Sequence, residues 1–544
     1  MFSANRLFPK HVRTPKNGPV PDHGVNGYDA DKQRYHPIRT LNMDRRHFLG
    51  AGAAAAATGT IFSRVPCHAA HRGTTRSSPS AAPAIIQTYT DQDHRQRLEN
   101  IRFCHQNIRA AMRKHLVTSY LPGQCCYNLG EYPCLKPWDP DQWDEQELDK
   151  LHAQGIELIQ LHEEWNDSQR LFGGNKLAPL NPAGLRRFID MVHRRGMKVI
   201  VYVSSGYFQR SDPDFRPEWA RPQDLIELYY DYAICSVASP SWRAYLLPRV
   251  RRILDDYGVD GIYNDLGYAQ PAANGQPSTK DEVPAFEESA THDGALADLL
   301  AIIYAEVHRR GGIVKVHRGG DSAPLTDLKV YDYLWVGEAV GNGDKLRQAV
   351  KNHTPYVVPC LDMSRAKIEN EDELYLDAIP YLQFPLLLAG RPFTGQRASI
   401  PGIKYRPEKD DFWTRHCRAI WKHYQSHPEG PHSYGWWDSV PGRSEARPTH
   451  ARWLRQYRPM VEEGTWAWLE VSDSSLFTQP LARDVVASVY ANRHLYLVLA
   501  NYGHAPATVR SNAPYATLAP QAAGPTTHWD IPARSLVILQ RAVS

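Results

Sequence analysis

Short apolar runs alternate with amphipathic helical patterns over about half of the chain, and this alternation constrains the fold more than any other feature. Helical patterns cover 144–154, 181–196, 240–257 and 290–310. Strand-like runs lie between and around them, at 116–122 or 124–130, 155–165, 198–205, 261–265, 312–320, 331–339, 356–363 and 381–390. Strict alternation predicts a parallel sheet. Eight units of this size predict an α/β fold of the closed (β/α)8 TIM-barrel type.

An open, doubly wound sheet is the alternative architecture. It is disfavoured because no glycine-rich phosphate-binding loop follows the first strand. We find no internal repeats. Residues 206–236 form a connection too long for a plain loop, which suggests a functional role.

The pattern changes on both sides of the expected catalytic barrel. We expect a disordered upstream extension at 1–42, a signal peptide at 43–70 and a linker at 71–90. The barrel, with a polar helix at 92–115, covers 91–400. An irregular helical connection follows at 401–464, and an antiparallel β-sandwich with a hairpin at Asn492-Arg493 covers 465–544.

A basic leader explains the net charge of +4. The first 70 residues carry ten Lys and Arg against four Asp and Glu. The remainder carries 53 basic and 55 acidic residues, a net charge of −2 that argues against a nucleic-acid partner. No later stretch is long and apolar enough to span a membrane.

Within this leader, a segment starts at Met43 in which Arg45-Arg46 precede Phe48-Leu49, and an alanine-rich run follows. This order resembles a twin-arginine export signal. The alternative is a chance arginine pair before an alanine-rich helix. The resemblance implies a bacterial precursor that uses the twin-arginine export machinery and a periplasmic or secreted product.

The cysteines do not indicate a zinc site. The chain has eight of them, without a CxxC pair or a His/Cys cluster. After export, one or two disulfides are possible, and the nearest candidates in the sequence are Cys104, Cys125, Cys126 and Cys134. The 14 Trp and 29 Tyr fit either ordinary packing or stacking against sugar rings.

Polar residues follow the apolar runs at six of the expected strand ends. A buried unpaired charge is expensive, so Asp265 at the end of the fourth strand needs either a fixed partner or an open polar pocket. The active site of such a barrel lies at the carboxyl ends of its strands. The polar strand ends are His162-Glu163-Glu164-Trp165, Tyr202 with Ser204-Ser205, Asn264-Asp265, His317-Arg318, Glu338 and Asp362.

Asp265 and Glu338 are the candidate catalytic pair. Two carboxylates that flank a cleft are the minimum requirement for glycoside hydrolysis, and a retaining enzyme holds them about 5 to 5.5 Å apart. One stays ionised, and the other needs a raised pKa, which apolar Trp335 would supply. The alternative is that each carboxylate caps a helix or pairs with Arg318.

The segment GVDGIYNDLGY resembles the fourth-strand motif of retaining glycoside hydrolases with α-galactosidase-like or dextranase-like barrels. The resemblance implies that Asp265 is the nucleophile and Glu338 the acid/base. It implies a trailing β-domain and a carbohydrate substrate, and we expect no cofactor. The chain lacks the Arg-x-x-Ser-Asp-Asp run of α-galactosidases and the Trp-x-Asp-Met-Asn-Glu run of α-glucosidases.

The other strand-end residues are candidates for substrate binding. Arg and His donate hydrogen bonds to sugar hydroxyls and Glu accepts them. Asp362 would bind two hydroxyls, or replace Glu338 as the acid/base. The binding set is His162, Glu164, Trp165, Tyr202, Asn264, His317, Arg318, Trp335 and Asp362, in which Trp165 and Trp335 are stacking candidates.

Two rival functions use the same fold. In a metal-dependent hydrolase, the ligands would be His162, Asp265, His317 and Asp362, although neither a His-x-His pair nor a His-Glu-x-x-His helix is present. A non-catalytic carbohydrate-binding barrel would bind glycans without cleaving them, because a fold does not prove an activity.

Overall fold

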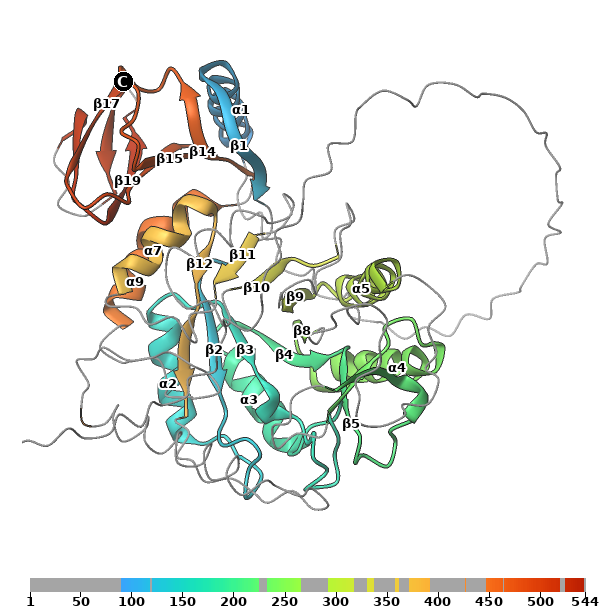
Figure 1. Ribbon diagram of the computed structural model, residues 1–544. Helices are drawn as coiled ribbons and strands as arrows, with labels where there is room; N and C mark the ends of the chain where they lie inside the picture. Colours follow the sequence, from blue (N-terminus) through green and yellow to red (C-terminus); the bar gives the residue numbers. More distant parts are fainter. Residues whose placement is uncertain are drawn as a thin grey trace, which may run out of the picture. The chain divides into compact units, whose positions relative to one another are not determined.

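The computed structural model describes a parallel sheet and an antiparallel sheet (Figure 1). Glu338, Arg318, Asp362, the leader, the linker and most of 401–464 lie outside the described residues. The described residues are 90–117, 120–224, 232–265, 292–317, 330–336, 358–361, 371–391, 426, 447–462, 464–518 and 524–542.

Every pairing in the parallel sheet joins strands that run in the same direction. The strands, in the order of the sheet, are β12 (Phe384–Pro385), β11 (Val358–Leu361), β10 (Tyr333–Val336), β9 (Ile313–His317), β8 (Gly261–Asp265), β4 (Lys198–Ser204), β3 (Leu158–Leu161), β2 (Gln124–Asn128) and β13 (Leu387–Gly390). The first expected strand is therefore the run at 124–130.

The two ends of this sheet belong to one stretch of chain. Leu386 alone separates β12 from β13. β12 pairs with β11, and β13 pairs with β2. Residues 384–390 thus pair with strands from both ends of the sheet, and the parallel sheet therefore curls.

The four predicted helices between the strands are present within a few residues of their expected bounds, and the fifth, α7, was not predicted. Asp141 caps the first of them through a capping box, Asn181 and Pro182 open the second, and Ser239 caps the third, which ends at Gly258 with φ 73°. These helices are α2 (Gln142–Ala153), α3 (Pro182–His193), α4 (Pro240–Tyr257), α5 (His292–His308) and α7 (Glu371–Ala378).

Helix α3 shows how a helix covers the sheet. Its fully or almost fully buried side chains include Leu185, Phe188, Ile189 and Val192. The ring of Phe188 lies 4.9 Å from that of Tyr127 on β2. Each large apolar side chain buried in this way contributes roughly 1.5–3 kcal/mol.

Strands β8 and β9 approach so closely that one position admits only glycine. Gly261 has φ 147°, and a Cβ there would lie 1.9 Å from the carbonyl oxygen of Ile313. The contact holds the start of β8 against the start of β9.

A short sequence repeat, which we did not expect, lies just before two of the parallel strands. Val-His-Arg-Arg-Gly ends α3 at 192–196 and α5 at 307–311. His193 Nε2 lies 2.8 Å from Asp260 Oδ2, and that carboxylate oxygen accepts the Val199 N–H at 2.8 Å. His308 and Asp332 repeat the arrangement at 2.8 Å, with Val314 donating to the same oxygen at 2.9 Å.

The long connection at 206–236 contains a small antiparallel sheet instead of being an irregular loop throughout. Its strands pair in the order β5-β7-β6. They are β5 (Tyr207–Gln209), β7 (Tyr232–Cys235) and β6 (Ala220–Asp224).

The antiparallel sheet joins the first described segment to the last. The polar helix expected at 92–115 ends early, as α1 (Asp91–Asn107), and a strand follows it. In the described part of the chain the antiparallel strands form one sheet of seven, where a sandwich was expected. In order, the strands are β1 (Ile108–Val117), β14 (Thr465–Ser474), β15 (Val485–Ala491), β16 (Leu495–Asn501), β19 (Ser535–Arg541), β17 (Ala507–Thr517) and β18 (Thr526–Ile531).

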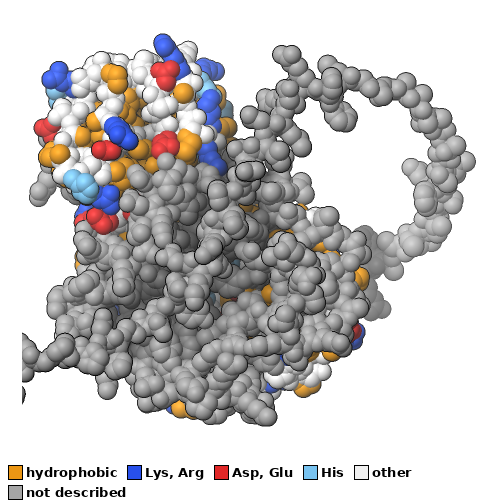
Figure 2. Space-filling model, in the orientation of Figure 1, with side chains coloured by type: hydrophobic (Ala, Val, Ile, Leu, Met, Phe, Trp, Pro, Cys, Tyr) orange, Lys and Arg blue, Asp and Glu red, His pale blue; other side chains and the backbone are white. Residues whose placement is uncertain are grey.

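Both faces of this sheet are buried at its centre. In β15, Ala487 and Val489 belong to an apolar cluster with α1. On the alternate face, the Tyr490 hydroxyl donates to the Ile379 carbonyl at 2.5 Å and Ser488 donates to that of Pro380 at 2.6 Å. The hairpin predicted between β15 and β16 is present. Figure 2 shows Lys, Arg, Asp and Glu side chains interspersed among other side chains over the antiparallel sheet.

No disulfide joins the five cysteines whose side chains the structure describes, so the disulfides considered from the sequence do not form among them. These buried residues are Cys104, Cys125, Cys126, Cys134 and Cys235. Among the described helices, none combines the length and the hydropathy of a membrane span.

Candidate active site

Asp265 closes β8, and two neighbouring strands hold its carboxylate. The Tyr202 hydroxyl donates to Oδ2 of Asp265 at 2.8 Å. His317 Nδ1 lies 3.3 Å from Oδ1. The Asp265 side chain remains 16% exposed, so the carboxylate has fixed partners and also stays accessible.

The strand register explains why these residues meet. Tyr202 pairs with Tyr263, and Ser204 pairs with Asp265. Tyr263 is also opposite Lys315, two residues before His317. Side chains two apart on a strand share a face, so Tyr202, Tyr263, Asp265 and His317 all face the same side of the sheet.

Aromatic rings enclose the floor of this cluster. The His162 ring lies 5.4 Å from that of Tyr263 and 5.2 Å from that of Trp335, both edge-to-face. Trp335 is fully buried, and its indole N–H has no hydrogen-bond partner among the described residues. The Trp335 ring thus adds an apolar surface to the cluster beside His162 and Tyr263.

Burial sets the protonation of the two best-defined groups. It lowers the pKa of His162 to about 3, against the opposing attraction of Asp265, so this imidazole is neutral at pH 7. Burial, and then the charge of Asp265, raises the pKa of Tyr202 well above its ordinary value. The Tyr202 hydroxyl therefore keeps its proton and acts as the donor.

The two glutamates that follow β3 have different environments. Burial raises the pKa of Glu164 to about 8, with a further contribution from the charge of Glu163. Glu164 is thus mostly protonated at neutral pH, and its Oε2 has no partner among the described residues. Glu163 instead pairs with buried Lys176 at 2.5 Å.

Two residues of the predicted binding set are not brought to Asp265. Trp165 is fully buried, and its N–H donates to the Tyr202 carbonyl at 2.8 Å, so it supports β4 and offers no free face for a sugar here. Asn264 lies between Tyr263 and Asp265 and points to the opposite face of β8. Its amide is buried without a partner among the described residues.

Sequence reasoning missed two contributors to this cluster. Tyr263 could have been found, because it lies two residues before Asp265 on the same strand and so shares its face. Lys176 gave no signal, because it lies in the loop after β3 and reaches the cluster only through the folded chain. Glu338, Arg318 and Asp362 remain predictions.

Within the described residues, no three His, Cys, Asp or Glu side chains are grouped as metal ligands would be. Asp362, the fourth ligand of the rival metal site, lies outside that part of the chain.

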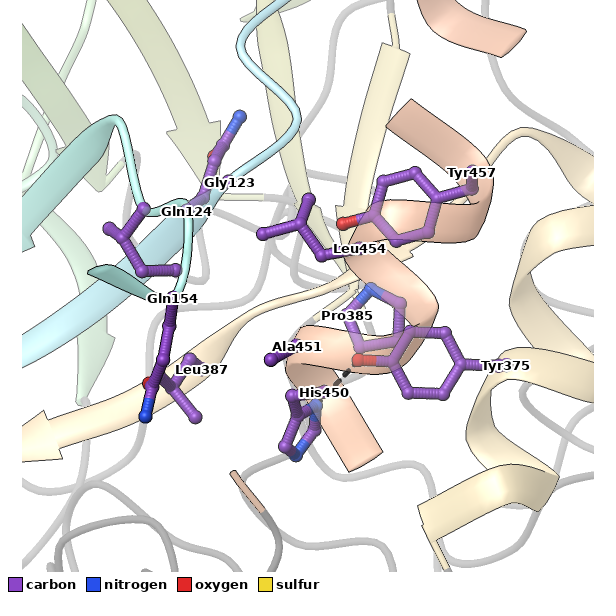
Figure 3. A pocket seen from close by; sticks show the side chains of 11 residues that line it. Gly123, Gln124, Gln154, Tyr375, Pro385, Leu387, His450, Ala451, Leu454 and Tyr457 are labelled. Atoms are coloured by element: carbon purple, nitrogen blue, oxygen red, sulfur yellow. Dashed lines mark hydrogen bonds between the residues drawn. The ribbon is translucent and has the colours of Figure 1, made fainter. Parts of the chain in front are cut away.

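A small cavity lies elsewhere, beside the start of β2 (Figure 3). Its volume is about 20 Å³, enough for one water molecule. Across it, the Tyr375 hydroxyl and His450 Nδ1 are 2.6 Å apart. None of the candidate site residues lines this cavity, and it lies near the amino ends of β2 and β3, away from the end that carries Asp265.

Comparisons with known proteins identify no family. No family model matches the sequence, and no curated protein matches it. The solved structures to which the chain is similar include the following three enzymes. An α-amylase from Anoxybacillus has 9% identity and a TM-score of 0.47, covering 78% of this chain and 99% of that chain.

Two further structures come from Geobacillus stearothermophilus. A GH36 α-galactosidase has 11% identity and a TM-score of 0.46, covering 77% of this chain and 56% of that one. A GH27 β-L-arabinopyranosidase has 12% identity and a TM-score of 0.41, covering 78% and 98%. Values at this level assign neither a family nor an activity to the chain.

Proposed function

We propose that the protein is a glycoside hydrolase in which Asp265 is the nucleophile. The observation that carries the proposal is an accessible carboxylate at the carboxyl end of a parallel strand, held by Tyr202 and His317 above a floor of aromatic rings. Carboxylates at this end of the strands are where barrels of this kind carry their chemistry.

The proposed architecture is a closed (β/α)8 barrel. Seven parallel strands follow one another in chain order from β2 to β11, and residues 384–390, which hold β12 and β13, pair with both β11 and β2 as the eighth unit. Closure would place the ends of β8 and β10 on one rim. Glu338, two residues after β10, is the proposed acid/base on that rim.

The proposed reaction has two steps and retains the anomeric configuration. An Asp265 oxygen attacks the anomeric carbon, the bond to the leaving oxygen breaks, and Glu338 gives that oxygen its proton. A water molecule then attacks the same carbon while Glu338 takes its proton, and the bond to Asp265 breaks. Tyr202 and His317 keep the Asp265 oxygens aligned, and neutral His162 adds no charge that would compete for them.

The test is a screen of aryl glycosides and polysaccharides, with the product's anomeric configuration read by NMR. Asp265→Asn and Glu338→Gln should each abolish turnover and leave the thermal melt nearly unchanged. Full activity of the Asp265 variant would exclude it as nucleophile. Glycan binding without hydrolysis by the wild type would favour a carbohydrate-binding barrel, and stoichiometric zinc in the purified protein would favour a metal hydrolase.

We also propose that the precursor is exported by the twin-arginine route to the periplasm or beyond. The support is the order of Arg45-Arg46, Phe48-Leu49 and the alanine-rich run. Replacing both arginines by lysine should leave the full chain in the cytoplasm of a bacterial host. Unchanged export of that variant would overturn the proposal.

A further inference from the structure

The loop at 166–181, between β3 and α3, has a fixed conformation. The Asp167 carboxylate accepts the backbone N–H groups of Leu171, Phe172 and Gly174, each at 2.8 Å. An antiparallel bridge joins Asn166 to Pro179 across the base of the loop. These bonds hold the loop so that Lys176 is turned inward and is fully buried.

Lys176 forms a buried ion pair with Glu163. Nζ lies 2.5 Å from Oε1, and the two side chains are 1% and 3% exposed. Desolvating two charges costs several kcal/mol per ion, and apolar residues of similar volume often replace such pairs without loss of stability. Stability alone therefore does not account for this pair.

The pair lies against the side chain that holds Asp265. The Lys176 ammonium is 5.2 Å from the centre of the Tyr202 ring and 4.2 Å from that of Tyr232. A cation against an aromatic ring draws on its electron density. For Tyr202 this strengthens the hydroxyl as a donor to the Asp265 carboxylate.

We propose that Lys176 and Glu163 are positioning residues that hold and polarise Tyr202 against Asp265. Lys176 supplies the positive charge, and Glu163 fixes its place and offsets part of it. The proposal rests on the proposed glycosidase function, because it assigns the pair a role in keeping the nucleophile ionised and aligned.

Other titratable groups face both ends of this chain of contacts. Asp265 is faced by Tyr202 from β4 and His317 from β9, and it interacts electrostatically with His162 after β3. The ion pair is faced by groups from β7, the loop after β2 and its own segment: Tyr232, Cys235, Tyr132 and Glu164.

Substitutions that change the charge of the pair in opposite directions distinguish an electrostatic role from a packing role. Lys176→Met removes the positive charge and should move the acidic limb of the kcat/KM profile to higher pH. Glu163→Gln leaves the positive charge uncompensated and should move the limb to lower pH. Each shift should be about half a pH unit, and the double variant should return near the wild-type limb.

The measurement uses the full chain and the best aryl glycoside from the screen above. Lys176→Arg keeps the charge and should retain the wild-type limb. Lys150→Met is the matched control, because Lys150 is 62% exposed in its pair with Glu147. The positioning role would be overturned if the acidic limb stayed in place in every variant and activity fell only in proportion to the melting temperature.

A second readout does not need activity. Because His317 Nδ1 faces Asp265, its imidazole titration, followed by NMR, reports the charge of that carboxylate. The midpoint should move in opposite directions in Lys176→Met and Glu163→Gln. If it does so in a protein that cleaves no glycoside, the proposed function fails and the electrostatic link stands. If the enzyme is active but neither variant moves the His317 midpoint or the acidic limb, only the electrostatic link is excluded.

Discussion

At the scale of single residues, an aspartate at the end of an apolar strand was the most informative signal in the sequence. Burial of an unpaired charge is unfavourable, so Asp265 had to have partners or an opening, and the structure gives it both. Tyr202 and His317 were predictable for the same reason, as polar residues at the ends of neighbouring apolar runs.

Lys176 marks the limit of that reasoning. A lysine in a polar loop is normally solvated, and only the packed loop shows that this one is buried beside Tyr202. Trp165 marks the opposite error. An aromatic residue at a strand end fits a sugar platform equally well, but here its N–H is bonded to the Tyr202 carbonyl.

The hydroxyl of Tyr202 can be tested by itself. Tyr202→Phe removes one hydrogen bond to a carboxylate, worth about 1.5–3 kcal/mol. We expect kcat/KM for an aryl glycoside to fall by about ten- to a hundredfold, with the acidic limb of its pH profile moved upward. The melting temperature should change little, because Asp265 remains partly exposed.

Tyr304→Phe is the matched control for this variant. Tyr304 also donates to an aspartate, Asp332, at 3.2 Å, but it lies on α5, outside the cluster around Asp265. Its loss should leave kcat/KM within about twofold. Equal effects of the two substitutions would show that Tyr202 has no special role.

At the scale of secondary-structure elements, strong periodicity predicted α3, α4 and the central strands, and weak periodicity misled. The polar pattern from residue 92 onward continues past Asn107 into β1, where exposed and buried side chains alternate irregularly. β1 forms because β14 pairs with it, from Ile108 opposite Ser474 to Val117 opposite Thr465. A partner so distant in the sequence cannot be seen in any local pattern.

The repeated histidine–aspartate pairs tie helix ends to the next strands. At α3, the hydrogen bond with Asp260 raises the pKa of His193 above its ordinary value of 6.5. The folded state therefore keeps a proton that the unfolded state releases. This stabilisation is complete below about pH 6.5 and is lost as the pH rises through the raised pKa.

His193→Gln should remove this dependence while keeping a side-chain donor for Asp260. Above pH 6.5, the melting temperature of the wild type should fall relative to that of the variant until the histidine is neutral, after which the difference becomes constant. The measurement is a series of thermal melts across this range. As a control, the melting temperature of His152→Gln, a substitution at an exposed helix end, should change with pH in parallel with that of the wild type. The linkage would be excluded if His193→Gln did the same.

At the scale of the whole molecule, the antiparallel sheet is built from both ends of the described chain. Cys104 and Ile108 share an apolar cluster with Trp468 and Val471. The sequence predicted a barrel from residue 91 and a separate domain from 465, because strand pairing between distant segments leaves no local trace. The curled parallel sheet was predictable because each of its units is locally periodic.

This pairing predicts that the antiparallel sheet cannot be separated from the rest of the chain at the boundary expected from the sequence. A chain that begins at residue 118 lacks α1 and β1, so β14 loses one of its two antiparallel partners and the cluster around fully buried Trp468 opens to water. Burial of several large apolar side chains is worth several kcal/mol, a large part of the stability of an ordinary domain.

Residues 118–544 and 90–544 should therefore behave differently when each is produced alone. The longer chain should be soluble and melt in one cooperative transition, whereas the shorter one should aggregate, or lose the transition of the antiparallel sheet and bind a hydrophobic dye. Calorimetry and dye binding at equal concentrations measure both. If the shorter chain melted within a few degrees of the longer one, β1 would be an accessory strand, and the stability of the sheet would come from the strands after residue 464 alone.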